Sequence, residues 1–299
     1  LHMIKIIRKK LLHYFFYFFC KTTLATFLLK QLNNNKINFF DNKIDGLDKI
    51  SFKILFFSKI SRYHNGQEIK FKKKFKFKSP FIMELKLNEF TQNGYYFNIP
   101  HNGLGTLMQL MNNNVFIDIG ANVGVFSLMA SQIFKEVYSF ELMKENYTLL
   151  KNNLKLNKIS NVKAYNYALG ENQGYGKMII NPLNNGGTSV KLLDKKSENS
   201  LKILTLDQFN FKNVDLIKID VEGSELEVLK GLKETKDNYC PTFFIEVSSS
   251  LESVRKISTV LGKDYLSYFP PCNNLIPNDM IFVHKKNRDL VKQLKIHDF

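Results

Sequence analysis

The pattern of apolar and polar positions is clearest in the stretch that begins at residue 115. Residues 115–117 form a short apolar, β-rich run of the kind that builds a fully buried strand. From Val123 the apolar residues recur with a period near 3.6, which predicts a helix. Gly120 and Gly124 bracket the turn between them, and glycine lets a backbone turn sharply beside a ligand. This order predicts the first unit of a nucleotide-binding βαβ fold.

A second β-rich run, residues 137–141, ends in an acid. Glu141 follows Asp118 by 23 positions, close to the roughly 20 residues that precede a ribose-binding carboxylate. Such a carboxylate can accept both ribose hydroxyls in charge-assisted hydrogen bonds. The Gly-x-x-x-Gly spacing is not that of most dinucleotide folds, and no Walker-type Gly-Lys-Ser/Thr marks a triphosphate site. We therefore expect an adenosine-type cofactor, with an α/β core that binds no cofactor as the alternative.

The rest of the chain continues the alternation of strands and helices. Further β-rich runs predict strands at residues 161–168, 215–220, 242–247, 265–269 and 280–283. Helical periodicity predicts helices over residues 144–157 and 251–261, and a hairpin arm is expected at 175–180. The predicted fold class is α/β, with a Rossmann-like sheet that has helices on both faces.

Four of these stretches together resemble one family. They are FIDIGANVGVFSLMA at residues 116–130, FE at 140–141, ALG at 168–170 and VDLIKIDVEGSELEVLKGL at 214–232. They are similar to the FkbM family of S-adenosylmethionine (SAM)-dependent methyltransferases, many of which O-methylate sugars on natural products and surface glycans. The resemblance covers residues 89–247, and IKIDVEGSE is its most specific part. It implies a class I methyltransferase sheet, mostly parallel with an antiparallel last strand.

The resemblance also implies a cofactor site at the carboxyl ends of the first three strands. Its expected residues are Asp118, Gly120, Asn122, Gly124, Glu141 and Ala168. Asp118 would bind the amino group of SAM directly or through water, and Glu141 would hold the ribose. The Ala168 backbone would meet the adenine ring, and the residues of the glycine turn would lie beside the methionine moiety.

Acids at predicted strand ends indicate the acceptor site. Asp118, Glu141, Asp220 and Glu246 are all expected at one rim of the sheet, where open α/β sheets bind ligands. Crowded carboxylates repel one another, so their gathering favours a functional role over a structural one. Glu246 is a further candidate acceptor contact. The sequence shows no zinc-type ligand spacing and no His/Asp cluster, so we expect no metal.

Three neighbouring residues are the catalytic candidates. We expect Asp220 to orient or deprotonate the acceptor hydroxyl, with Glu222 as the second candidate. Lys218 precedes Asp220 by two strand positions, so both side chains point to the same face. Lys218 would either hold Asp220 ionised or bind an anionic acceptor. An ion-paired strand end without a catalytic role is the alternative.

Charge divides the chain into two predicted domains. The net charge is +16, and residues 1–80 carry +14 of it, with 18 Lys and Arg against 4 Asp and Glu. We predict a basic, aromatic-rich extension over residues 1–80 and a methyltransferase domain over residues 81–299. Three cysteines without disulfide spacing favour a cytoplasmic location.

The sequence of the basic extension is compatible with more than one binding partner. Residues 4–30 predict a helix that either packs on the protein or a second subunit, as in a homodimer, or lies on the inner face of a membrane. Lys21 makes a membrane span the least favoured choice. The run KFKKKFKFK at residues 70–78 predicts a strand with one basic face. A solvated edge strand is favoured there over an anionic surface, and nucleic acid is not favoured.

The sequence therefore predicts a SAM-dependent O-methyltransferase acting on a sugar of a glycan or glycan precursor. A lipid-linked or other small-molecule acceptor is the first alternative, favoured by the basic N-terminal segment. A non-catalytic SAM-binding partner in a glycan assembly complex is the second.

Overall fold

The computed structural model describes residues 70–86, 103–180, 188–193, 195–197, 200–247, 251–269 and 279–296 of the chain. By compactness the chain divides into two units, Leu1–Phe75 with Ile82–Ile99, and Lys76–Phe81 with Pro100–Phe299. The predicted boundary between residues 80 and 81 stays a prediction. The predicted helix over residues 4–30 and most of the segment that precedes the glycine turn lie outside the described residues.

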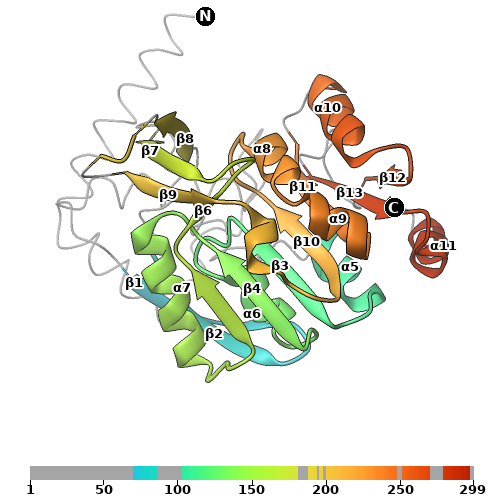
Figure 1. Cartoon of the computed structure of the whole chain (residues 1–299). Helices are drawn as coiled ribbons and strands as arrows, with labels where there is room; N and C mark the ends of the chain where they lie inside the picture. The colour runs from blue at the N-terminus through green and yellow to red at the C-terminus, as the bar shows by residue number, and fades with distance from the viewer. Residues whose placement is uncertain are drawn as a thin grey trace, which may run out of the picture. The chain divides into compact units, whose positions relative to one another are not determined.

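The second unit contains a seven-stranded sheet in the order β12-β13-β11-β10-β3-β4-β5 (Figure 1). Its strands are β3 (Val115–Ile119), β4 (Glu136–Phe140), β5 (Val162–Tyr165), β10 (Val214–Ile219), β11 (Thr242–Glu246), β12 (Tyr265–Tyr268) and β13 (Asp279–His284). Strand β13 pairs antiparallel with both of its neighbours, whereas β11, β10, β3, β4 and β5 pair parallel. The mostly parallel sheet with an antiparallel last strand is thus confirmed.

Chain order reverses between β3 and β10, the two central strands. From β3 the chain passes outward to β4 and β5, and from β10 it passes the other way to β11. Ligands of open α/β sheets bind beyond the carboxyl ends of the strands at such a reversal. The sheet therefore places the ends of β3 and β10 at the centre of a binding site.

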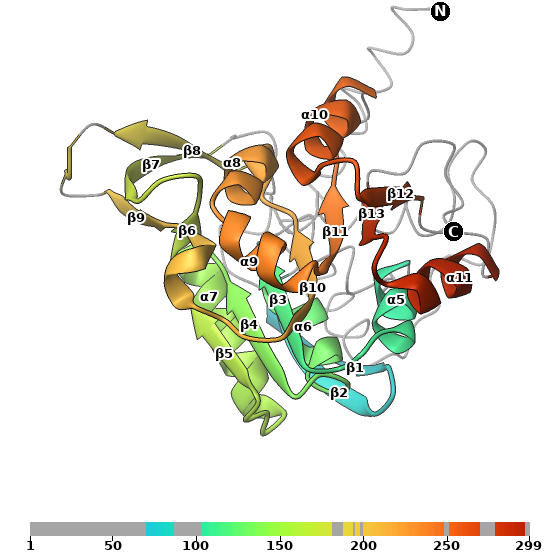
Figure 2. The same cartoon turned by 45° about the vertical axis from the view of Figure 1, so that its right-hand side comes forward.

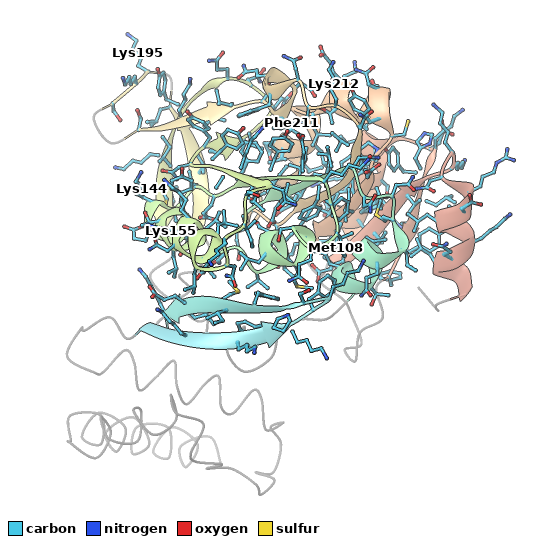
Figure 3. The ribbon with its side chains drawn as sticks, turned by 90° about the horizontal axis from the view of Figure 1, so that it is seen from below. Met108, Lys144, Lys155, Lys195, Phe211 and Lys212 are labelled. Carbon is cyan, nitrogen blue, oxygen red and sulfur yellow. The ribbon has the colours of Figure 1, made fainter. Side chains whose placement is uncertain are left out.

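Helices cover both faces of this sheet, as predicted. They are α5 (Leu104–Leu110), α6 (Val125–Ala130), α7 (Lys144–Leu156), α8 (Glu225–Lys230), α9 (Lys233–Tyr239), α10 (Leu251–Leu261) and α11 (Arg288–Ile296). Met108 of α5 and Lys144 and Lys155 of α7 lie on one side of the sheet, and Phe211 lies on the other (Figure 3). Among the described residues, none of the helices combines the length and apolarity that a membrane crossing requires.

A smaller sheet of four strands has the order β6-β9-β7-β8 (Figure 2). It consists of β6 (Ala168–Leu169), β7 (Gly174–Ile180), β8 (Thr188–Leu193) and β9 (Leu201–Leu204), and the 3-10 helix η1 (Leu206–Phe209) follows. The prediction of one strand over residues 161–168 was wrong, because β5 ends at Tyr165 and Ala168 belongs to β6. Between the two strands, the side-chain amide of Asn166 donates to the backbone carbonyl oxygens of Glu141 and Leu142. These hydrogen bonds hold the turn that separates β5 from β6.

The lysine-rich run forms β1 (Lys70–Lys76), which pairs with β2 (Pro80–Lys86) in a two-stranded sheet. Phe75 is buried, whereas Lys74 and Lys76 on either side of it are exposed. The predicted alternation of an apolar and a basic face is therefore confirmed, because successive strand residues point to opposite faces.

Candidate functional site

The glycine turn joins the ends of the two central strands. Gly120 has a φ of +79°, and a Cβ there would lie 1.7 Å from the carbonyl oxygen of Asp220. The Asp220 amide in turn donates to the Ile119 carbonyl over 3.1 Å. Gly124 has a φ of +91°, and a Cβ there would lie 2.3 Å from the Leu150 side chain. Both positions need glycine because of backbone conformation and because of space.

Glu141 lies against this turn with its carboxylate. One carboxylate oxygen accepts a hydrogen bond from the backbone N–H of Asn122 over 2.7 Å, and the other accepts one from the backbone N–H of Met143 over 2.8 Å. Burial raises the pKa of Glu141 to about 7, although both backbone donors oppose the shift. A carboxylate has about four lone-pair sites, so two remain for hydroxyl donors such as those of a ribose.

The side chain of Asn122 adds a second group to the turn that can accept a hydrogen bond from a ligand. Its φ of +50° is a left-handed conformation that asparagine tolerates well. Within the described part of the chain, its side-chain oxygen is buried and has no hydrogen-bond partner. A buried acceptor without a partner is unusual, and a donor group of a ligand would satisfy it. The residues of the turn therefore fit SAM, which carries an amino group and ribose hydroxyls.

Two asparagines that support the site, the buried Asn153 and the partly buried Asn166, were missed from the sequence. The Asn153 side chain is fully buried and donates to the Val123 carbonyl over 3.0 Å, which fixes the glycine turn from α7. Asn166 fixes the loop after Glu141, as described above. The available signal was the position of Asn153 among Leu150 and Leu154 on the apolar face of a predicted helix, where a polar residue needs a partner.

Asp118 is placed differently from the prediction. Strand β3 continues to Ile119, so Asp118 lies within the strand and not at the rim, and its side chain is fully buried. Its Oδ2 accepts from the Ser127 hydroxyl over 2.6 Å, and its Oδ1 lies 3.5 Å from Lys218 Nζ. Burial raises the pKa of Asp118, and Lys218 and Ser127 oppose the shift. Its contact with the amino group of SAM stays a prediction.

Lys218 and Asp220 lie on one face of β10 and its end, as predicted. The Lys218 side chain is buried, and its ammonium lies 3.1 Å from Asp220 Oδ2. The same ammonium donates to the Gly120 carbonyl over 3.1 Å and pairs with Asp118. An ammonium has three protons, so these groups can occupy all of them. This geometry favours the expectation that Lys218 holds Asp220 ionised over the one in which it binds an anionic acceptor.

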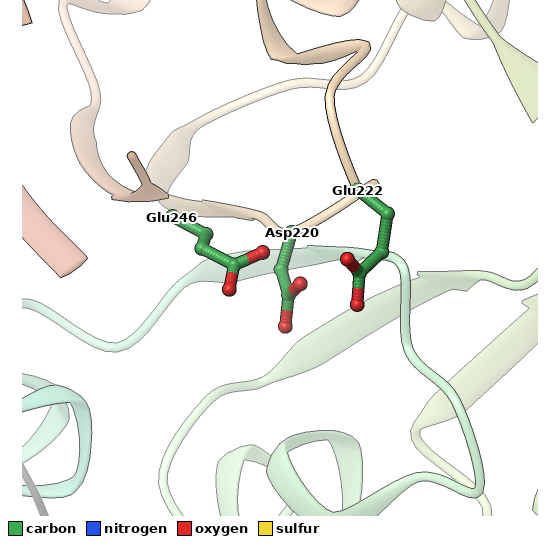
Figure 4. A group of neighbouring side chains, drawn as sticks. All are labelled: Asp220, Glu222 and Glu246. Atoms are coloured by element: carbon green, nitrogen blue, oxygen red, sulfur yellow. The ribbon is translucent and has the colours of Figure 1, made fainter. Parts of the chain in front are cut away.

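Three acids gather where β10 and β11 end (Figure 4). Asp220, Glu222 and Glu246 each offer a carboxylate oxygen, and these oxygens lie within 4.8 Å of one another. The Asp220 side chain is 34% exposed, so a ligand can reach it. Glu222 has a φ of +55°, a left-handed conformation that is uncommon for residues other than glycine and asparagine. The predicted gathering of Asp220 and Glu246 is confirmed, and Glu222 joins them.

Protons are divided unequally among these acids. Burial raises the pKa of Asp220, but Lys218 and a hydrogen bond from Glu246 outweigh it, so the pKa lies below its usual value. Burial and the Asp220 charge raise the pKa of Glu246 to about 9. At neutral pH Asp220 is therefore ionised, and Glu246 is protonated and donates to it. Burial and Asp220 also raise the pKa of Glu222 to about 7.

Further expected positions remain untested. Ala168 is buried in β6 and pairs with Ile203 of β9, and its contact with an adenine ring stays a prediction. The aromatic and polar segment at residues 89–105 predicts either a pocket entrance lined by Tyr95, Tyr96 and His101 or a capping loop, and these three residues lie outside the described residues. That no metal is needed also stays a prediction.

Comparison with known proteins places this site in a family. Residues 118–273, about half of the chain, match the Methyltransferase FkbM domain. Methyltransferase 1 of Beauveria bassiana is 23% identical over 175 residues, which cover 50% of this chain and 70% of that protein. Methyltransferase sdnD of Sordaria araneosa is 27% identical over 165 residues, which cover 43% of this chain and 64% of that protein.

Among solved structures, Methyltransferase FkbM of Methylobacillus flagellatus superposes with a TM-score of 0.44 at 20% identity. The superposition covers 58% of this chain and 45% of that chain, so this chain matches less than half of that protein's length. The domain match includes the glycine turn, Glu141 and the acids after β10. The chain belongs to the FkbM methyltransferase family, and its cofactor is S-adenosylmethionine.

Proposed function

We propose that the protein transfers the methyl group of SAM to a hydroxyl of a sugar in a surface glycan or glycan precursor. The observation that carries this proposal is the state of Asp220. Its carboxylate is partly exposed, is held ionised by a buried lysine and lies against the glycine turn. An ionised carboxylate accepts a hydrogen bond from a hydroxyl group and so can aim its oxygen at a methyl donor.

SAM supplies a methyl group that its sulfonium already activates, so the main task of the protein is alignment. Alignment alone is worth about 7–11 kcal/mol in well-oriented systems. Asp220 accepts the hydrogen bond of the attacking hydroxyl and fixes its direction. The oxygen gains the methyl carbon and must lose its proton, which a positioned base accelerates by about 10²–10⁴-fold.

Glu222 is the better base of the two candidates. A general base works best when its pKa lies near the working pH. The pKa of Glu222 is about 7, whereas Lys218 helps to hold that of Asp220 below its usual value. We therefore assign orientation of the acceptor to Asp220 and acceptance of its proton to Glu222.

The charge of the site supports a neutral acceptor. Asp279 lies opposite the protonated Glu246 in the β11–β13 pair, and its pKa of about 6 leaves it ionised at neutral pH, so it adds its charge to those of Asp220 and Glu222. An anionic acceptor would be repelled here, because like charges in a site of low dielectric disfavour each other strongly. A sugar hydroxyl brings no charge and offers a donor to these oxygens.

A lipid-linked acceptor is the second candidate. The +14 charge of residues 1–80 favours it, because basic segments are attracted to anionic membrane surfaces. This role, a cytoplasmic location beside the membrane and a homodimer remain proposals. A SAM-binding partner without catalysis is the alternative from another class.

The test is methyl transfer from labelled SAM into fractionated extracts of glycans, lipid-linked sugars, nucleotide sugars and nucleic acid. We expect label in a glycan or sugar fraction, lost in Asp220→Ala and kept in Asp264→Ala, a matched exposed aspartate. Label in the lipid-linked fraction alone would select the second candidate. SAM binding without label in any fraction would overturn the catalytic proposal.

A further inference from the structure

A row of polar residues crosses three neighbouring strands of the large sheet. Ser139 of β4 lies beside Asp118 of β3, which lies beside Lys218 of β10 in the strand register. All three side chains are buried. Strands buried on both faces are normally almost continuously apolar, so a polar row at the centre of a parallel sheet needs an explanation.

Ser127, in helix α6, links Ser139 to Asp118 through hydrogen bonds. The Ser139 hydroxyl donates to the Ser127 hydroxyl over 2.8 Å, and Ser127 donates to Asp118 Oδ2 over 2.6 Å. Each hydroxyl has one proton to donate. Ser127 donates its proton to Asp118 and therefore accepts from Ser139, so both hydrogen bonds point towards Asp118. Lys218 then pairs with Asp118 over 3.5 Å and with Asp220 over 3.1 Å.

The hydrogen bond from Ser127 and the ammonium of Lys218 both favour the charged form of Asp118 against its burial. A fully buried carboxylate is costly unless it is paired and its lone pairs are satisfied. Without the Ser127 hydroxyl, the Oδ2 atom of Asp118 would lose the hydrogen bond that Ser127 donates to it. An ionised Asp118 would then draw the Lys218 ammonium closer to itself and away from Asp220. This change weakens the hold of Lys218 on Asp220.

We propose that Ser127 is a positioning residue for methyl transfer, which acts through Asp118 and Lys218 to hold the Asp220 carboxylate ionised and aimed at the acceptor. The importance of Asp220 for transfer rests on the function proposed above. The other groups that face Asp220 are Glu222 from the following turn, Glu246 from β11 and Asp279 from β13. Substitution at Ser127 changes none of these residues.

The experiment compares Ser127→Ala with Ser131→Ala. Ser131 lies four positions further along the chain and donates to the Leu128 carbonyl, so it is a matched serine outside the polar row. Carbon-13 NMR of side-chain carboxyls, assigned with Asp220→Asn, reports the pKa of Asp220 directly. We expect Ser127→Ala to raise this pKa by about one unit, at the low end of the 1–3 units that a nearby opposite charge is worth, because the variant moves the Lys218 charge without removing it. Ser131→Ala should leave it unchanged.

Two further variants keep the inference testable if Ser127→Ala folds poorly. Ser139→Ala removes the donor one step further from Asp118 and should raise the pKa of Asp220 by a smaller amount. Ser127→Thr keeps the hydroxyl and should restore the wild-type value. In transfer assays, kcat of Ser127→Ala should fall about tenfold, as for a loss of about 1.4 kcal/mol, with KM for SAM unchanged.

The titration needs no acceptor, so it separates this inference from the proposed function. If the wild-type protein transfers no methyl group to sugars, the proposed function fails, and the link from Ser127 to Asp220 is still measured. Equal pKa values of Asp220 in Ser127→Ala and Ser131→Ala would overturn the link. A fall in kcat without a change in that pKa would overturn it as well, because the loss would then be structural.

Discussion

The ammonium of Lys218 lies 3.1 Å from the carboxylate of Asp220, where β10 passes into the turn that follows it. The same ammonium donates to the carbonyl of Gly120, in the turn that fits SAM. One buried cation therefore joins the turn that fits SAM to the carboxylate that we propose orients the acceptor. It also fixes the distance between them, because it is itself held by the buried Asp118.

Lys218→Met is expected to destabilise the fold and abolish transfer. The substitution keeps the length of the side chain but leaves Asp118 as an uncompensated buried charge. Breaking a buried pair by removing one partner costs about 3–5 kcal/mol. Urea unfolding followed by circular dichroism measures this difference.

The matched control for Lys218→Met is Lys230→Met. Lys230 pairs with Glu171 over 3.0 Å, but both side chains are more than 40% exposed, and exposed pairs contribute little. Its free energy of unfolding should stay close to that of the wild type. Equal stability losses in the two variants would contradict the structural role of Lys218.

Glu141→Ala is expected to lose affinity for S-adenosylhomocysteine while the fold stays intact. Glu141 accepts from two backbone amides and keeps lone pairs that suit ribose hydroxyls. Hydrogen bonds to a charged group are worth about 1.5–3 kcal/mol, so a loss of roughly 10- to 150-fold is expected by calorimetry. Glu145→Ala, an exposed residue of α7, is the control. Unchanged affinity in Glu141→Ala would remove the cofactor-site assignment.

Glu246→Gln is expected to make stability less dependent on pH. The pKa of Glu246 is about 9 in the folded protein and near its usual value, about 4.3, in the unfolded chain. The folded state thus binds the proton more tightly, and its stability falls as pH rises from about 4.3 towards 9. Glutamine resembles the protonated form and keeps a donor for Asp220. The melting temperature of the variant relative to wild type should therefore rise between pH 6 and pH 8.5.

A constant difference between the two proteins over that pH range would contradict the raised pKa of Glu246. The comparison is informative because Asp220, Glu222 and Asp279 titrate in both proteins. Only the proton at position 246 differs between them, apart from its influence on these neighbours.

Chelation of divalent metal ions is expected to leave transfer unchanged. Lys218 balances the charge of Asp220, and Glu246 is protonated, so this part of the cluster is compensated without a cation. Rates measured with EDTA and after addition of magnesium should agree within error. A rate that falls with EDTA and returns with magnesium would show that the prediction of a metal-free site was wrong.

Much of the fold could be predicted because its signals are local. The run DLIKID holds three apolar residues, Leu216, Ile217 and Ile219, between two charged ends, and it forms β10 within one residue of its expected bounds. The helix expected over residues 251–261 is α10. The glycine turn was recognisable because only glycine fits where two backbone segments approach each other closely, and glycines at a fixed spacing can be seen in the sequence.

The polar row could not be predicted because it depends on strand register. Asp118 and Lys218 are 100 positions apart, and only the pairing of β3 with β10 places them side by side. Asp118 was expected at the rim because an acid after an apolar run resembles a strand end. Ser127 gave no signal of its own, since a serine within a helical period usually faces solvent or its own backbone.

The most direct test of the central claim is a single-turnover measurement with Asp220→Asn. Asparagine keeps the shape of the side chain but cannot attract the ammonium of Lys218 or accept a charge-assisted bond from the acceptor. We predict that methyl transfer to the sugar acceptor slows by about 100-fold, as expected for an acceptor that is no longer aligned, while S-adenosylhomocysteine affinity stays unchanged. An undiminished transfer rate in Asp220→Asn would contradict the account.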